Sequence, residues 1–130
     1  MNPAVNTGTV EISLRSDGIL YVRVLPGKVQ SLEDARQNLE AARKVGGNSL
    51  RAVIVDLRSC EPLEPEVRHH YSGDKMGESF GSLGIVIPPN AFGRMMGNIY
   101  LRIARPGIPI QLFEDIEKAA DWLMSASRPA

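Results

Sequence analysis

Histidine is the side chain best suited to bind a metal or transfer protons near neutral pH, and the chain holds two, His69 and His70. Adjacent residues of a helix point about 100° apart, so both imidazoles rarely reach one metal ion. His70 and Asp74 have i,i+4 spacing, which can hold a metal or tune a pKa. This pair alone makes a metal enzyme or hydrolase the weakest functional hypothesis. We expect solvated or interface histidines and no metal site.

The single cysteine, Cys60, is the other candidate for chemistry. A reactive thiol needs an electropositive environment, and Arg58 is close in the sequence, but Glu61 and Glu64 oppose it. We therefore expect a half-buried, inert thiol. No G-x-G-x-x-G fingerprint, Gly-Lys-Ser/Thr phosphate loop or Ser-His-Asp order is recognisable. The sequence therefore predicts no enzyme, and no catalytic, cofactor-binding or metal-binding residues.

A glycine- and methionine-rich stretch, Gly93-Arg94-Met95-Met96-Gly97, is a candidate contact surface. Glycines four apart lie on one helix face and allow close backbone approach. Methionine is an adaptable apolar side chain that fills gaps or meets partners. Packing of this helix on its own sheet is the plainer interpretation. The alternative is a dimer or ligand surface made of Gly93, Met95, Met96 and Gly97.

The composition fits one globular domain. The chain has 130 residues, 43% of them apolar and 23% charged, near the globular average. Fifteen basic residues balance fifteen acidic ones, which disfavours nucleic-acid binding and favours self-association, most simply as a homodimer. The single cysteine, an N-terminus without leader-like features and no apolar run near ~18 residues predict a cytoplasmic protein without a membrane span.

The first half of the chain contains clear element signals. Residues 9–14 and 19–24 are strand-like and flank a Ser16-Asp17-Gly18 turn, which predicts a β-hairpin. Ser31, with Asp34 three residues later, indicates a capping box that opens a helix ending at Gly46-Gly47. The continuous apolar run 51–57 is typical of a central strand buried on both faces.

The second half continues the alternation of helices and strands. We expect helices at 65–78 and 91–104, the latter capped by Asn90, strands at 83–88 and 108–113, and a last helix that starts at Glu114 and Asp115. The order is ββαβαβαβα. It predicts a single α/β domain over 1–130, with a core of roughly 9–125. Its sheet is mostly parallel with an N-terminal antiparallel hairpin.

Two stretches, together with this order, resemble the STAS superfamily, the fold of bacterial anti-sigma-factor antagonists and of the cytoplasmic domains of sulfate transporters. AVIVDLRSCEPLEPEV (52–67) is similar to the family's strand, aspartate, loop and helix start. The tail GNIYLRIARPGIPIQLFEDIEKAADWL (97–123) resembles an uncharacterised bacterial SpoIIAA-like group, which ends in a pattern matched here by Phe113, Ala119 or Ala120, Trp122 and Leu123.

The resemblance also says where a phosphorylation switch would lie. In the antagonists, an Asp-Ser pair at the start of the second helix is the switch, and counting from Asp56 the matching pair here is Glu64-Pro65. Proline has no hydroxyl, so the resemblance implies a module without the usual phospho-acceptor serine. Ser59 is a nearby hydroxyl that does not match the motif position. The implied docking surface consists of Arg58, Ser59, Glu64, Pro65 and Glu66.

The functional hypotheses follow from these residues. The first is a non-enzymatic STAS-like regulatory module that acts by protein–protein contact and forms a homodimer. The alternative is a small-ligand or lipid-binding domain with an apolar pocket near residues 73–97, where glycines and methionines gather. No cofactor is expected under either hypothesis.

Overall fold

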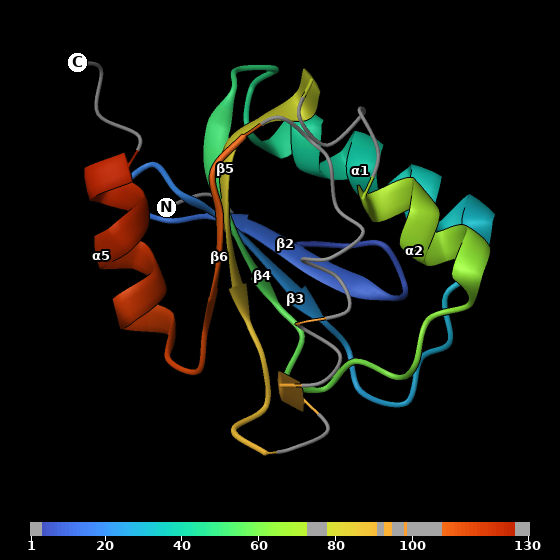
Figure 1. Cartoon of the computed structure of the whole chain (residues 1–130). Helices are drawn as coiled ribbons and strands as arrows, with labels where there is room; N and C mark the ends of the chain where they lie inside the picture. Colours follow the sequence, from blue (N-terminus) through green and yellow to red (C-terminus); the bar gives the residue numbers. More distant parts are fainter. Residues whose placement is uncertain (1–3, 73–77, 91–92, 95–97, 99–107, 127–130) are drawn as a thin grey trace.

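The computed structural model describes residues 4–72, 78–90, 93–94, 98 and 108–126, and it shows a single α/β domain built on one six-stranded sheet (Figure 1). The strands are β1 (Val5–Asn6), β2 (Val10–Leu14), β3 (Leu20–Val24), β4 (Arg51–Asp56), β5 (Phe80–Val86) and β6 (Ile110–Phe113). The helices are α1 (Leu32–Val45), α2 (Pro65–Ser72) and α5 (Ile116–Ala126).

The strands lie in the sheet in their order along the chain, from β1 at one edge to β6 at the other. β1, β2 and β3 pair antiparallel, and β3, β4, β5 and β6 pair parallel. α1 and α2 lie on one face of the sheet, whereas α5 packs on the other face against β4, β5 and β6 (Figure 1). The predicted α/β class, with parallel strands after an antiparallel hairpin, is confirmed.

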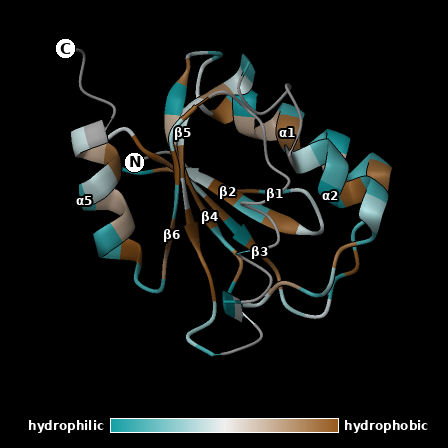
Figure 2. Cartoon of the chain, in the orientation of Figure 1, coloured by the Kyte–Doolittle hydropathy of each residue, from teal (hydrophilic) through white to brown (hydrophobic). Residues whose placement is uncertain are grey.

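Alternation along the central strands gives each face of the sheet its own hydrophobic core. Val53 of β4 packs in the core under α1, and its neighbour Ile54 packs in the core under α5. Both side chains are fully buried. Figure 2 shows the hydrophobic colouring concentrated on the strands between the helices. The continuous apolar run that predicted a strand covered on both faces is explained by this arrangement.

The predicted capping box of α1 is present. Ser31 Oγ accepts a hydrogen bond from Asp34 N at 3.1 Å, and Asp34 Oδ2 accepts one from Ser31 N at 2.9 Å. The predicted hairpin turn is also present, because Gly18 takes a φ of 85° and Asp17 Oδ1 accepts from Ile19 N. These local signals fix the entry to α1 and the register of β2 with β3.

Three strands and the start of the last helix differ from the prediction. β6 begins at Ile110 rather than at 108, and α5 begins at Ile116 rather than at 114. β1, of two residues, was not predicted, because so short a segment carries no alternation. β5 begins at Phe80 rather than at 83, and it ends at Val86 rather than at 88. The second residue of β5 is Gly81, where a Cβ would lie 3.1 Å from Leu50 O. Glycine is needed there for the close backbone approach, so the start of the strand lacks the β-branched residues from which a strand is predicted.

The two expected middle helices are described only in part. α2 ends at Ser72, and residues 73–77 of the expected helix lie outside the described residues. In the expected helix 91–104, residues 93, 94 and 98 are helical and the others lie outside the described residues. Asn90 caps this segment as predicted, because its Oδ1 accepts from Gly93 N at 2.7 Å and its carbonyl accepts from Arg94 N at 3.0 Å.

Gly84 allows a close approach of α5 to the sheet. A Cβ at this position would lie 3.1 Å from Leu123 Cδ1 and 3.3 Å from Ala119 Cβ. We expect Gly84→Val to push α5 outward and to lower the free energy of unfolding by about 1–3 kcal/mol, measured by urea denaturation. Gln111→Val places the same side chain at an exposed site of β6 and should change stability by under about 0.5 kcal/mol. Equal losses would contradict the packing explanation.

Candidate functional site

The central strand β4 ends in a buried carboxylate, Asp56, which is held from three directions. The residue is 3% exposed. Tyr21 OH of β3 donates to Asp56 Oδ2 at 2.6 Å. Arg58 donates from Nη2 to Oδ2 at 2.8 Å and from Nε to Oδ1 at 3.0 Å, and its backbone N–H also donates to Oδ1, at 3.1 Å. The carboxylate therefore fixes the first residues of the loop that leads to α2.

These contacts set the protonation states of the group. Burial alone would raise the pKa of Asp56, but the hydrogen bonds from Arg58 and Tyr21 outweigh it and hold that pKa below its ordinary value. Burial, together with the hydrogen bond to Asp56, raises the pKa of Tyr21 to about 12. The pKa of Arg58 is raised, chiefly by its hydrogen bonds to Asp56. At neutral pH, Asp56 and Arg58 therefore form an ion pair, and Tyr21 is a neutral phenol. We call these three residues the Asp56 clamp.

Of the five residues of the predicted docking surface, one belongs to the clamp and four do not. The guanidinium of Arg58 is committed to Asp56, although the side chain is 44% exposed. Ser59, Glu64, Pro65 and Glu66 are all exposed. Pro65 is the first residue of α2, and the carbonyl of Glu64 accepts from Arg68 N at 3.0 Å. The predicted surface is therefore assembled around the start of α2, with Arg58 as its support.

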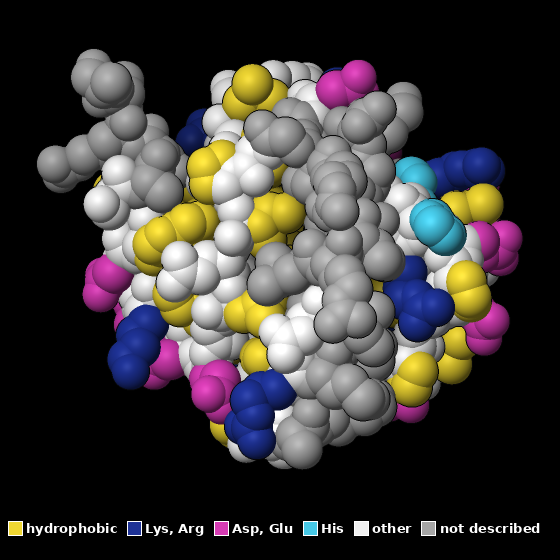
Figure 3. All heavy atoms as spheres, viewed as in Figure 1, with side chains coloured by type: hydrophobic (Ala, Val, Ile, Leu, Met, Phe, Trp, Pro, Cys, Tyr) yellow, Lys and Arg dark blue, Asp and Glu magenta, His cyan; other side chains and the backbone are white. Residues whose placement is uncertain are grey.

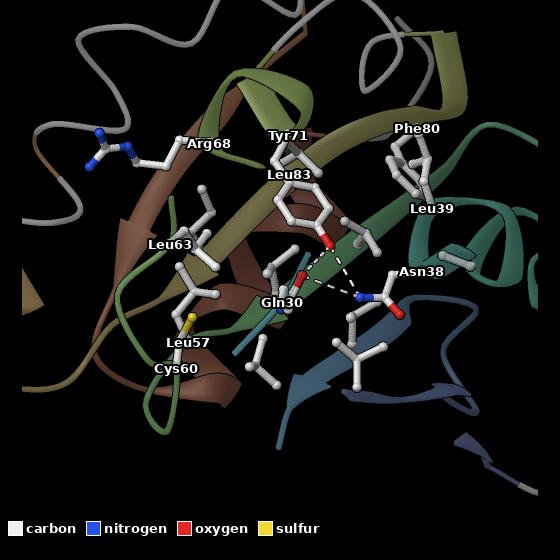
Figure 4. Close-up of a pocket in the computed structure, with 17 residues that line it drawn as sticks. Gln30, Asn38, Leu39, Leu57, Cys60, Leu63, Arg68, Tyr71, Phe80 and Leu83 are labelled. Carbon is white, nitrogen blue, oxygen red and sulfur yellow. Dashed lines mark hydrogen bonds between the residues drawn. The ribbon is translucent and has the colours of Figure 1, made fainter. Parts of the chain in front are cut away.

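An apolar cavity of about 100 Å³ lies between α1, α2 and the sheet (Figure 4). Its wall on the sheet side is made by residues of β2 to β5 that point toward α1. Side chains that line it include Val22, Val53, Val55, Leu83, Leu39 and Ala42. The pocket was predicted near residues 73–97, but the cavity lies under α2 and most of its lining residues come from outside that span. From that span, among the described residues, only Phe80, Leu83 and Ile85 line it.

A polar network closes one side of the cavity. Tyr71 OH donates to Gln30 Oε1 at 2.6 Å, and Asn38 Nδ2 donates to the Tyr71 oxygen at 3.2 Å (Figure 4). Asn38 Oδ1 accepts from Thr7 Oγ1 at 2.6 Å and from Thr9 Oγ1 at 3.3 Å. Burial raises the pKa of Tyr71 to about 12. These groups satisfy one another and tie α1 and α2 to the connection between β1 and β2.

The other side of the cavity is formed by the loop after β4 and by Arg68 of α2. Figure 4 shows Leu57, Cys60 and Leu63 on this side, with the Arg68 guanidinium beyond Leu63 and pointing away from the cavity. Burial, with a smaller effect of Glu61, raises the pKa of Cys60 to about 11. The thiol is half-buried and protonated at neutral pH, as expected for an inert cysteine.

A second hollow lies where β5 and β6 end. It has a volume of about 280 Å³, is open to solvent, and is lined by Ile87, Arg94, Asn98, Leu112, Phe113 and Glu114. Gly93, next to Arg94 in the chain, is buried, and a Cβ at this position would clash with the carbonyl oxygen of Pro88. Gly93 is thus required by packing within the chain. The other three predicted surface residues, Met95, Met96 and Gly97, lie outside the described residues.

The remaining candidate residues form no metal site in the described part of the chain. His69 is exposed, His70 is half-buried, and the rings of His70 and Tyr71 meet edge to face at 5.6 Å. Asp74 lies outside the described residues. Within the described ranges, no group of three or more His, Cys, Asp and Glu side chains is placed to hold a metal ion. No helix of those ranges is both long and apolar enough to span a membrane.

The comparison with protein families gives a single assignment. The model of a domain of unknown function, DUF7793, matches residues 12–127. The chain belongs to the DUF7793 family. The match begins within β2 and covers the rest of the sheet to β6 and the helices α1, α2 and α5. It therefore contains the Asp56 clamp and every cavity-lining residue except Val10. No curated protein and no solved structure matches the chain.

The sequence predicted the candidate docking residues of this DUF7793 domain to lie together but did not single out Tyr21, Gln30, Asn38 or Tyr71. Asn38 carried a usable signal. It is a polar residue beside Leu39 in the apolar stripe of α1, and it is 4% exposed. A buried amide on a core-facing helix position requires partners from other elements. Thr7 and Thr9, from the β1–β2 connection, and Tyr71, from α2, are distant from Asn38 in sequence.

The clamp predicts a specific pH dependence. The folded-state pKa of Asp56 lies below the unfolded value of about 3.9, so the unfolded chain binds more protons between these two values. The stabilisation is fully present above the unfolded pKa and is lost as pH falls through the folded pKa. We expect Asp56→Asn to lower the free energy of unfolding at pH 7 by about 2 kcal/mol. We also expect it to flatten the loss of stability below about pH 4.

Urea denaturation at a series of pH values measures both effects. Asp121→Asn makes the same chemical change at an exposed position of α5 and serves as the control. The control should keep the wild-type stability at pH 7. Parallel stability-versus-pH curves for wild type and Asp56→Asn would contradict the clamp.

Proposed function

We propose that this DUF7793 domain is a non-enzymatic, STAS-like regulatory module that acts by protein–protein contact in the cytoplasm. One observation carries the proposal. After a buried strand that ends in an aspartate, the chain presents Glu64, Pro65 and Glu66 on the surface at the first turn of α2. This is the position at which the resemblance puts the docking face of the anti-sigma-factor antagonists, here without a serine hydroxyl.

The residues at both ends of this surface are held in place, which supports a role in protein–protein contact. Arg58 is anchored to the buried Asp56, and Val67, in the first turn of α2, is 0% exposed. Pro65 has a fixed φ suited to the first helical position. A surface fixed at both ends loses little conformational entropy when a partner binds.

The charge of the surface indicates the chemistry of the partner. Glu61, Glu64 and Glu66 are exposed near the start of α2. Charged side chains of both signs are interspersed over the face shown in Figure 3, as expected for a chain with no formal net charge. A local group of acids on a neutral protein fits a partner with a basic patch, which would gain on-rate and register from the complementarity. Self-association as a homodimer remains a further part of the proposal.

Charge reversal tests the proposed contact. We expect native mass spectrometry of wild-type protein, purified from its own host, to show a dimer and a retained protein partner, with no added mass of about 80 Da per phosphate. Glu64→Lys combined with Glu66→Lys should remove the partner and keep the dimer. Glu33→Lys with Glu40→Lys, at exposed sites of α1, is the matched control and should keep both. A strictly monomeric chain without a partner, or a phosphorylated one, would contradict the proposal.

A further inference from the structure

We infer that the cavity under α2 is a binding site for a small amphiphile, with a short aliphatic tail in the cavity and a carboxylate head at Arg68. The inference is independent of the proposed docking surface, because the cavity lies at the inner face of α2 and the acids lie on its outer face.

The wall selects an apolar group of limited size. Protein interiors are close-packed, with few voids larger than a water molecule, so an apolar space of about 100 Å³ is unusual in a core this small. Water gains few partners against valine, leucine and alanine side chains, and apolar cavities stay dry. An engineered apolar cavity of ~150 Å³ in another protein takes up benzene. By this scale the present cavity fits roughly four or five carbon atoms.

The hydrogen-bonding groups on the polar side of the cavity already bond to one another and are not available to the head group of a ligand. Tyr71 OH donates to Gln30 at 2.6 Å and accepts from Asn38 at 3.2 Å, so the network is satisfied within the protein. A head group placed there would have to break these bonds and leave buried groups without partners, which is costly. The head must therefore face the opposite side, where Leu57, Cys60 and Leu63 form the wall.

Arg68 supplies the charge on that side. It is the only charged residue among the described residues that line the cavity. Its guanidinium makes no hydrogen bond or ion pair with any residue in the described ranges, including Glu64 one turn earlier on α2. The nearby thiol of Cys60 is neutral, because burial raises its pKa. The Arg68 side chain lines the rim and its guanidinium points outward in this structure, so binding would require it to turn toward the opening. In that rotamer a planar guanidinium matches a carboxylate at the end of an aliphatic chain.

Methyl-detected NMR titration with hexanoate tests the site. The valine and leucine methyl groups that line the cavity should shift and saturate, whereas those of the α5 core should not. 1-Hexanol should bind more weakly, because it has the tail without the anion. Hexyl phosphate separates the two possible sources of an anionic head. Tighter binding of hexyl phosphate than of hexanoate would overturn the carboxylate assignment.

Two variants separate the tail from the head. Ala42→Leu adds carbon atoms at a cavity-lining position of α1 and should abolish the shifts with both hexanoate and 1-hexanol. Arg68→Gln should weaken hexanoate about tenfold and leave 1-hexanol unchanged. Arg36→Gln, on the exposed face of α1, is the control and should change neither. Saturable hexanoate binding that Arg68→Gln does not weaken, or no saturable methyl shift with any probe, would overturn the inference.

Discussion

The buried carboxylate of Asp56 is the constraint on which the rest of the structure depends. It ends the central strand, and both its oxygens are occupied by Tyr21 from β3 and by Arg58 from the following loop. Removing either partner would leave part of a buried charge unsatisfied, which costs more than the net contribution of an ordinary hydrogen bond. The loop therefore leaves the sheet in one direction, and that direction sets where α2 begins and what lies beneath it.

From this point the chain forms two surfaces on one short helix. α2 has eight residues, and its main packing partner is α1 rather than the sheet. Its inner side holds Val67 and Tyr71, and the acids at its start face solvent. Tyr71 ties it to α1 through Asn38 and to Gln30, so polar contacts supply part of the attachment that a close-packed apolar interface would otherwise give.

Most of the fold could be predicted because its signals are local. The capping box of α1, the turn at Gly18 and the apolar run of β4 each specify structure within a few residues. β1 was missed because two residues carry no period, and the start of β5 was missed because Gly81 is selected by a close backbone approach. The placement of Glu64, Pro65 and Glu66 followed from Pro65 at a helix start.

The cavity could not be predicted, because it arises where side chains from several elements meet and their combined volume does not fill the space between them. Val22, Val53 and Ala42 are ordinary choices for their elements, and only their meeting from three elements leaves the space unfilled. The Asp56 clamp was hidden for a similar reason. Asp56 and Arg58 are two residues apart, but Tyr21 is separated from them by α1 and comes close only when β3 pairs with β4.

Because α2 forms part of the cavity wall, a ligand that fills the cavity would stabilise the position of α2. At ~24 cal/mol per Å³, a void of about 100 Å³ costs on the order of 2 kcal/mol, and an apolar occupant recovers part of that cost only while α2 stays in place. A ligand can shift an equilibrium only by its differential affinity for the two states, and this difference is available here. Occupancy of the cavity would therefore act on α2, the helix at whose start the proposed docking surface lies.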